Sequence, residues 1–205
     1  MARDKAETKA RILAAVGKLL AESGFKSLGV NAIAREAGVD KVLIYRYFDG
    51  LSMLLRQFAQ AGDYWLTMEA LVGDESAVEA STLTDWMTYL LLEFMGDLQE
   101  RSITQEILRW ELLEGNELTD ELAQVRDQLA LDSLKFLKSK GEFPEGQDVP
   151  AISAVLIAGV VYLTLRAKIH RTFMGIDFSS PQGWQRIESA LASIIQSTLQ
   201  EQECS

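Results

Sequence analysis

Apolar residues recur at helical spacing along nearly the whole chain. Ile12, Val16, Leu19 and Leu20 follow one another at i, i+4, i+7 and i+8, and Ser23-Gly24 ends this first predicted helix. No alternating strand pattern, internal repeat or low-complexity run is present. The sequence therefore predicts an all-α fold. Further helices are predicted over residues 30–37 and 40–48, from Asp49 through Met68, around Trp86 to Phe94, from Ser102 to Leu112, from Thr119, over 150–172 and from Ser180 to Thr198.

The most informative stretch is residues 30–48, VNAIAREAGVDKVLIYRYF, where two short helices flank a turn. Ala34 is small enough for a helix crossing, Gly38 suits the left-handed end of the first helix, and Asp40 can cap the second. This is the pattern of a helix-turn-helix. The exposed face of its second helix would present cationic, aromatic and methyl groups to phosphates and base edges. A small helical hairpin without DNA-binding function shows the same Ala and Gly spacing, so the motif needs its context.

That context resembles a known family. Residues 7–55 are similar to the N-terminal domain of the tetracycline-repressor (TetR) family, through TKARILAAVGKLLAESGF, IAREAGV and the Ile44-Tyr45-x-Tyr47-Phe48 signature. The resemblance implies a helix-turn-helix DNA-binding domain over residues 1–50 and a helical effector-binding and dimerisation domain over 51–205. It implies a ligand-responsive regulator, most simply a repressor, that binds a palindromic operator as a homodimer. The expected DNA-binding residues are Arg35, Lys41, Val42, Tyr45, Arg46 and Tyr47.

The chain departs from the family pattern at several DNA-contacting positions. Leu28 and Gly29 stand where a Thr or Ser is frequent, and Leu43 stands where a Thr is frequent. Tyr47 replaces a His, and Leu51 replaces a Lys near the start of the fourth helix. Each lost cationic contact should lower the salt dependence of binding by about one unit. Ser27 or Gly29 is expected to cap the first motif helix instead.

Charge divides unevenly along the chain. Residues 1–50 hold nine Lys and Arg against six Asp and Glu, a net of +3, and the remainder holds eleven against twenty-four, a net of −13. The total of −10 argues against a protein that coats nucleic acid non-specifically, because such binding comes from neutralising phosphates. It is compatible with a small basic surface on an acidic body.

The composition predicts a soluble, cytoplasmic protein. The N-terminus lacks the apolar run of a signal peptide. The lone cysteine, Cys204, cannot form an internal disulfide. The longest apolar stretch, Val149 to Leu165, is interrupted by polar residues and is interpreted as too short to span a bilayer, so no membrane partner is expected.

The last two long helices are predicted to form a dimer interface. Residues 150–172 are apolar on most sides, and Ser180-Pro181 starts a final helix with an apolar stripe. Two such helices from each subunit would make a four-helix interface, as the resemblance also implies. The alternative is that they complete the core of a monomer. The expected interface residues are Ile152, Val155, Gly159, Leu163, Trp184, Ile187, Leu191 and Ile194.

Aromatic residues between the two ends of the chain are candidates to line a cavity for a small, mostly apolar effector. The alternative for each is ordinary core packing, which is the commoner role of such residues. Arg109, Glu111 and Arg166 are polar candidates for the same cavity, with surface salt bridges as the alternative. The expected ligand-binding residues are Trp65, Met68, Trp86, Tyr89, Phe94, Trp110, Phe136 and Tyr162.

The sequence gives little support for a catalytic function. His170 is the single histidine, and the sequence has no metal-ligand spacing, phosphate-binding glycine loop or nucleophile elbow. We expect no enzyme activity, no metal and no cofactor. Two alternatives to a DNA-binding regulator stay open. One is a co-regulator that acts through a protein partner with weakened DNA binding, suggested by Leu43 and Leu51, and the other is a helical enzyme with an apolar cavity.

Overall fold

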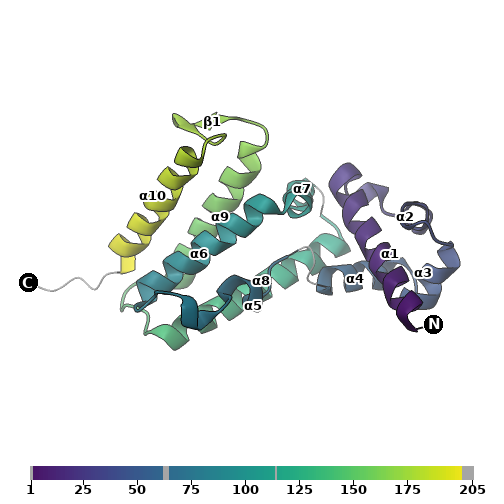
Figure 1. Ribbon diagram of the computed structural model, residues 1–205, viewed down its shortest axis with the longest axis horizontal. Coiled ribbons are helices and arrows are strands. Elements are labelled where there is room, and N and C mark those ends of the chain that lie inside the picture. Colours follow the sequence, from purple (N-terminus) through teal and green to yellow (C-terminus); the bar gives the residue numbers. More distant parts are fainter. Residues whose placement is uncertain (1, 62–64, 114, 200–205) are drawn as a thin grey trace, which may run out of the picture. The chain divides into compact units, whose positions relative to one another are not determined.

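The computed structural model describes residues 2–61, 65–113 and 115–199, and Cys204 lies outside these ranges. The fold is all-α, as predicted, apart from one small hairpin (Figure 1). The helices and strands are α1 (Ala2–Ser23), the 3-10 helix η1 (Phe25–Ser27), α2 (Val30–Ala37), α3 (Lys41–Phe48), α4 (Leu51–Gln60), α5 (Met68–Val72), the 3-10 helix η2 (Glu75–Ala77), α6 (Leu83–Glu100), α7 (Ser102–Glu111), α8 (Glu117–Lys140), α9 (Val149–Ala167), β1 (Thr172–Phe173), β2 (Ile176–Asp177) and α10 (Pro181–Leu199).

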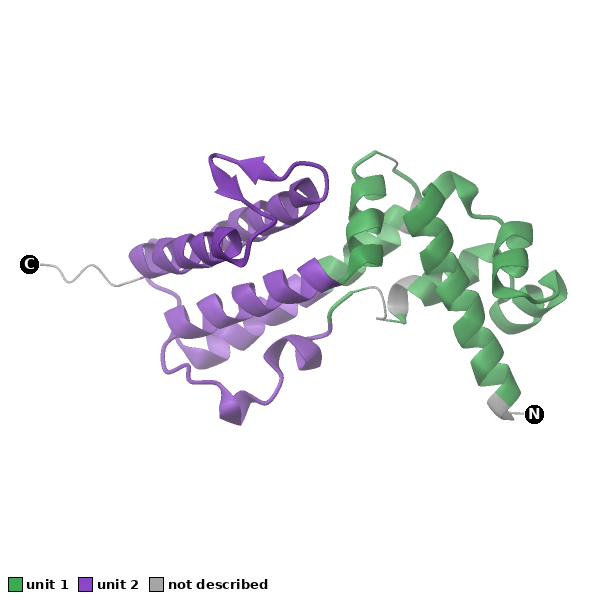
Figure 2. Ribbon diagram, turned by 45° about the horizontal axis from the view of Figure 1, so that its top comes forward, with its two compact units in different colours: residues 1–66, 101–128 green, residues 67–100, 129–205 purple. Residues whose placement is uncertain are grey.

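The chain forms two compact units (Figure 2). Unit 1 comprises residues 1–66 and 101–128, and unit 2 comprises residues 67–100 and 129–205. Helix α8 contributes residues to both. The boundary predicted at residue 50 does not coincide with these two units, and it stays a prediction.

Unit 1 is built around α1, which packs against α2, α4 and α7, while α3 packs against α2 and α4. Two glycines of this unit permit close packing. Gly17 faces the ring of Phe58, and Gly24, at φ 71°, ends α1 against the indole of Trp110. A Cβ on Gly24 would lie 2.8 Å from that indole, so the position requires glycine for both space and conformation. The fully buried side chains of this core include Ile12, Val16, Leu20, Ile33, Ile44, Phe48, Leu54 and Ile107.

Unit 2 is built around α6, which packs against α5, α9 and α10. The hairpin between α9 and α10 pairs Thr172 with Asp177 and Phe173 with Ile176. Its two turn residues, Met174 and Gly175, both have positive φ, which is the backbone of a two-residue hairpin turn.

Several capping predictions are confirmed. Gly38 ends α2 in the left-handed conformation, and the Asp40 carboxylate accepts a hydrogen bond from the Val42 amide at the start of α3. Ser180 precedes Pro181, and its hydroxyl accepts a bond from the Gly183 amide. These residues fix element ends by local chemistry, which is why the sequence alone revealed them.

Other element predictions are wrong. The helix expected from Asp49 through Met68 is two helices, because α4 ends at Gln60 and α5 begins at Met68. Helix α6 runs from Leu83 to Glu100, beyond the predicted end near Phe94. Helix α8 begins at Glu117, two residues before the expected cap: the Asn116 side chain accepts from the Thr119 amide and Thr119 Oγ1 accepts from the Asn116 amide.

Two further corrections concern α7 and α9. Ser102 is the first residue of α7 and not its N-cap; the N-cap is Arg101, which makes no side-chain capping bond. Helix α9 ends at Ala167 rather than at residue 172, and residues 172–177 form a hairpin that the sequence did not predict. Strands of two residues are too short to leave a period-2 pattern in the sequence.

Candidate functional site

The helix-turn-helix forms as the sequence predicts. The Gly38 amide bonds to the carbonyl oxygens of Ala34 and Arg35, and the Val39 amide bonds to Ala34 at 3.0 Å. Asp40 Oδ1 then accepts from the Val42 amide at 2.8 Å. These hydrogen bonds fix the backbone of the turn between α2 and α3.

Helix α3 has one buried and one exposed face. Ile44 is fully buried and Phe48 is nearly so, which anchors the helix to α2 and α4. Val42 and Tyr45 are 60% and 57% exposed. Val42 and Tyr45 are three positions apart on the helix, so both are available for contact on the same exposed face. Lys41 and Arg46 are also exposed on α3.

The other two predicted DNA-binding residues lie at the margins of this face. Arg35 is exposed near the end of α2. Tyr47 is half-buried, and the Lys5 ammonium of α1 lies 5.5 Å from its ring centroid. Five of the six residues thus lie on α3. Four of them are exposed, and the fifth, Tyr47, lies beside Lys5 of α1, where it can position that lysine as well as contact a ligand.

The departures from the family pattern take up packing positions. Leu43 and Leu51 are half-buried. Gly29 is the N-cap of α2 and makes no side-chain bond, whereas the Ser27 hydroxyl donates to the Gly24 carbonyl at 2.7 Å. Of the two expected replacements for the capping Thr, Gly29 therefore holds the position and Ser27 does not.

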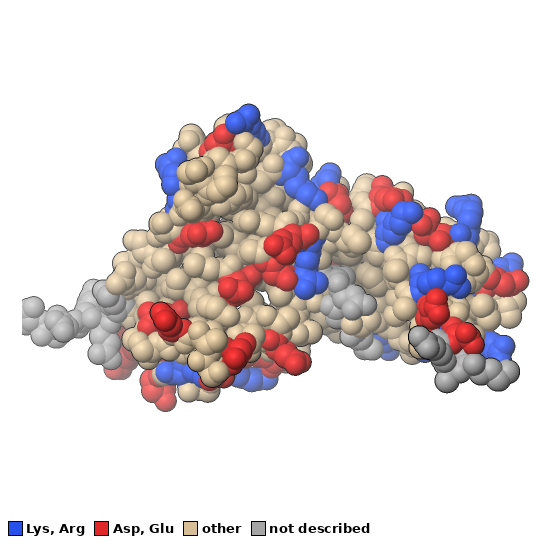
Figure 3. Space-filling view, in the orientation of Figure 1, with Lys and Arg blue, Asp and Glu red and all other residues tan. Residues whose placement is uncertain are grey.

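Acidic residues partly neutralise the positive charge of unit 1. Lys18 Nζ lies 2.6 Å from Glu36 Oε1, and this contact raises the pKa of Lys18. Figure 3 shows basic and acidic side chains interspersed over the part of unit 1 that faces the viewer. Binding to a polyanion would therefore depend on particular cations such as Lys41 and Arg46 rather than on a uniformly basic face.

The predicted ligand-binding residues divide between the units. Trp65 and Trp110 belong to unit 1 and the other six belong to unit 2. Trp65 is buried with the Arg126 guanidinium 5.5 Å from its ring, and Trp110 covers Gly24. Both indoles thus have packing partners inside unit 1.

Unit 2 gathers an aromatic cluster from α6 and α8. The rings of Trp86 and Phe136 meet edge to face at 5.2 Å, and those of Trp86 and Tyr89 at 5.8 Å. The Tyr89 hydroxyl donates to the Val72 carbonyl at 3.1 Å, and burial raises the pKa of this phenol. The Ser133 hydroxyl donates to the sulfur of Met68 at 3.2 Å. Phe94 is buried on α6.

Tyr162 lies elsewhere. It is 53% exposed on α9 and meets the ring of Phe173 in the hairpin, edge to face at 6.2 Å. The polar candidates are similarly dispersed: Arg109 forms a surface pair with Glu106, and the Arg166 guanidinium lies 4.6 Å from the Phe173 ring centroid. The surface salt bridge that was the alternative for Arg109 is what the structure contains.

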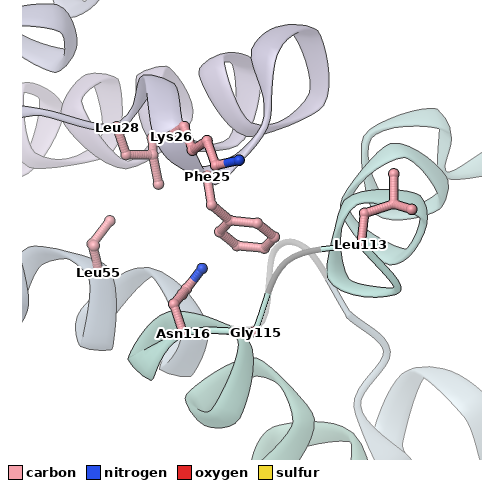
Figure 4. Close-up of a pocket in the computed structure, with 7 residues that line it drawn as sticks. All are labelled: Phe25, Lys26, Leu28, Leu55, Leu113, Gly115 and Asn116. Carbon is pink, nitrogen blue, oxygen red and sulfur yellow. The ribbon is translucent and has the colours of Figure 1, made fainter.

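A surface pocket of about 430 Å³ lies in unit 1, between η1, α4 and the turn that joins α7 to α8 (Figure 4). Phe25, Leu28 and Leu55 supply apolar walls, and Asn116 points toward them (Figure 4). None of the aromatic residues expected to line an effector cavity lines this pocket. Lys26, Leu113 and Gly115 complete its lining.

The α9 and α10 residues expected at a dimer interface are unevenly exposed. Val155 is 72% and Ile194 47% exposed, and a Cβ added to Gly159 would meet no atom within 4 Å. Leu191 is buried within unit 2. Ile152, Leu163, Trp184 and Ile187 are half-buried.

Helix α9 is also long and apolar enough to cross a membrane, with a mean hydropathy of 1.8, and no other helix in the described ranges is. By length and composition alone, the full helix from Val149 to Ala167 reaches the length that the stretch ending at Leu165 was expected to lack. Only 28% of it is buried in the single chain. Such an apolar helix needs a covering surface.

The parts of the chain that the structure describes contain no group of three or more His, Cys, Asp or Glu side chains placed to hold a metal. His170 is exposed beyond the end of α9, where its amide bonds to the Arg166 carbonyl at 2.9 Å.

Comparison with known proteins identifies the architecture. Residues 12–58 match the model of the bacterial regulatory proteins of the tetR family. No curated protein matches the chain. Among solved structures, a Rhodococcus sp. protein assigned to the TetR family of transcriptional regulators shares 20% identity with a TM-score of 0.66, covering 95% of this chain and all of the other.

Two further structures show the same likeness over nearly the whole chain. A TetR-family transcription regulator from Marinobacter aquaeolei VT8 is 14% identical with a TM-score of 0.66, over 97% of this chain and 98% of its own. Salmonella enterica GusR is 18% identical with a TM-score of 0.65, over 94% and 95%. At these identities the likeness establishes the fold.

The helix-turn-helix followed by a larger helical region is the architecture of these TetR-family structures. Residues 12–58 match the tetR-family model, and the chain as a whole shares the fold of the TetR-family structures.

Proposed function

We propose that this protein is a cytoplasmic repressor that binds a palindromic operator as a homodimer and leaves it when a small effector binds. The observation that carries the proposal is that α3 has one buried and one exposed face. Ile44 and Phe48 are buried, whereas Val42 and Tyr45 are exposed. A helix held in this way can enter a major groove, with its tyrosine and methyl groups against base edges.

The homodimer is supported by the exposed apolar side of α9. Val155 and Tyr162 are largely exposed, and Gly159 leaves room for close helix approach. Burying this side against a second copy would remove the apolar surface from water, and two-fold symmetry would make the same residues meet on both subunits. A symmetric dimer presents two α3 helices, which is why the operator should be a palindrome.

The effector is supported by the aromatic cluster of Trp86, Tyr89 and Phe136 in unit 2, which lies outside the helix-turn-helix. Such a ligand can release DNA only if it binds the DNA-incompetent conformation more tightly than the competent one.

The test is to incubate the purified protein with sheared genomic DNA at physiological salt and to sequence what is retained. Recovery of a palindrome with half-sites about one helical turn apart, overlapping a promoter, is the expected result. Recovery of no defined sequence, with and without added metabolite extract, would overturn the proposal. It would then favour the co-regulator that acts through a protein partner.

A further inference from the structure

One cation in unit 2 is held by two aromatic rings at once. The ammonium of Lys140 lies 4.7 Å from the ring centroid of Trp86 and 4.8 Å from that of Phe136. The two rings meet at 80°, so they form a corner around the ammonium, here called the aromatic corner. Both distances are within the range of favourable cation–π attraction.

A carboxylate completes the surroundings of this ammonium. Glu75 of η2 forms an ion pair with Lys140 Nζ. The Lys140 side chain is only 18% exposed, whereas that of Glu75 is 52% exposed. The cation is thus largely withdrawn from water, between two π faces and one negative charge, which is the usual composition of a binding site for organic ammonium groups.

Lys140 can leave this site without disrupting a helix. It is the last residue of α8, and residues 141–148 after it form a loop. Its flexible four-carbon stem allows the ammonium to swing into solvent by side-chain rotation alone. The aromatic corner would then be open, with Glu75 still beside it.

An organic cation is better suited to the corner than lysine is. The primary ammonium of Lys140 is a compact and strongly hydrated charge, so withdrawing it from water is costly. A trimethylammonium group spreads its charge over methyl groups and loses less hydration when it packs against ring faces. An uncharged molecule of the same shape would gain nothing from Glu75 and little from the ring quadrupoles.

We propose that the aromatic corner of Trp86 and Phe136, with Glu75, is a binding site for an organic ammonium compound, and that Lys140 occupies it as a tethered competitor when the compound is absent. The identification of the aromatic corner as the effector site rests on the proposed function. It changes the expected effector from a mostly apolar molecule to one that carries a cationic head. Binding itself can be measured without DNA.

Competition by Lys140 makes the effect of its removal predictable. A ligand that must displace a tethered group binds with an affinity reduced by the fraction of open sites. Lys140→Ala removes three methylenes and the ammonium, which occupy about the volume of a trimethylammonium group. Choline should therefore bind Lys140→Ala on the order of ten-fold more tightly than it binds the unmodified protein.

The experiment is an isothermal titration of the full chain with choline and, in parallel, with 3,3-dimethyl-1-butanol, its uncharged isostere. The matched control is Lys138→Ala, since Lys138 lies 5.2 Å from the single ring of Phe143 on the same helix end. We expect tighter choline binding by Lys140→Ala, unchanged binding by Lys138→Ala, loss of binding in Lys140→Ala with Trp86→Leu, and no binding of the isostere. Equal choline affinity of Lys140→Ala and the unmodified protein, or equal binding of the isostere, would overturn the inference.

A measurement on the unmodified protein covers the case in which a variant does not fold. Ring currents should shift the ε-methylene proton resonances of Lys140 upfield, and added choline should return them toward those of exposed lysines. Resonances that stay unmoved at saturating choline would overturn the inference. A protein that binds choline but retains no operator would refute the proposed function alone, and one that retains an operator but does not bind choline would refute only the ammonium site.

Discussion

Glu111 of α7 and Arg126 of α8 form a two-bond ion pair inside unit 1. Arg126 Nη2 lies 2.6 Å from Glu111 Oε2, and Nη1 lies 3.0 Å from Oε1. The two side chains are only 9% (Glu111) and 20% (Arg126) exposed. Burial raises the pKa of Glu111 although Arg126 lowers it, so desolvation exceeds the attraction of the partner.

Removal of Arg126 should therefore lower the stability of the folded protein. Arg126→Met keeps the stem but leaves Glu111 as a buried charge without its cation, which should lower the free energy of unfolding by about 3–5 kcal/mol at neutral pH. Because the pKa of Glu111 is above its unfolded value, the folded state binds the extra proton, and stability declines as pH rises from about 4.5 through the folded-state pKa. Urea unfolding at pH 5 and pH 8 would measure both effects.

The control is Arg109→Met. Arg109 pairs with Glu106 on the surface of α7, where its side chain is 44% exposed, so its loss should cost less than about 1 kcal/mol. Comparable losses in the two variants, or an Arg126→Met protein equally stable at both pH values, would contradict this account of the pair.

Substitutions at exposed residues of α3 should weaken DNA binding without changing the stability of the protein. Tyr45→Ala and Arg46→Ala should each weaken binding to the retained operator by about ten- to a hundred-fold if the side chain contacts a base. Both side chains are exposed, so thermal stability and dimerisation should not change. Fluorescence anisotropy with labelled operator measures the affinity, with Lys138→Ala of unit 2 as the control. Wild-type affinity in both variants would exclude α3 as the reading helix.

Local chemistry explains which features could be predicted from the sequence. The turn of the helix-turn-helix depends on Gly38, Asp40 and a few buried apolar residues, all within nineteen positions of one another. Such a motif keeps its geometry wherever it occurs, so its helices, cap and exposed face followed from the residues alone.

Features that depend on distant residues were missed. The aromatic residues share helical spacing whether they line a cavity or pack together, and only the structure shows Trp110 against Gly24 and Tyr162 against Phe173. The contact of Lys140 with Trp86 joins residues more than fifty positions apart, and no periodicity reports it. Charge spacing likewise could not show that the Glu111 pair is buried.

The dimer interface can be tested at Gly159. Nothing in the described chain lies within 4 Å of a Cβ at this position, so Gly159→Leu should not disturb the single chain. In a close helix crossing, however, the larger side chain would separate the α9 helices, and the dimer dissociation constant should rise at least ten-fold on the overpacking cost. Sedimentation velocity would measure it. The matched control, Gly96→Leu on α6, also meets no atom within 4 Å and should leave the dimer intact. An unchanged dimer in Gly159→Leu would place the interface elsewhere.

Replacing glycine with alanine should have opposite effects on stability at two positions of unit 2, Gly183 and Gly159. A Cβ at Gly183 would lie 1.9 Å from the backbone carbonyl oxygen of Asp177, where the hairpin meets α10, so Gly183→Ala must displace one of them. The cost should be about 1–3 kcal/mol or more, which for a chain of this size lowers the melting temperature by several degrees. Gly159→Ala, in open space within a helix, should instead stabilise the single chain by about 0.5–1 kcal/mol. Calorimetric unfolding under conditions that keep the chain monomeric would compare them. A Gly183→Ala protein that melts at or above the wild-type temperature would show that the hairpin yields readily, and would count against a fixed junction between β2 and α10.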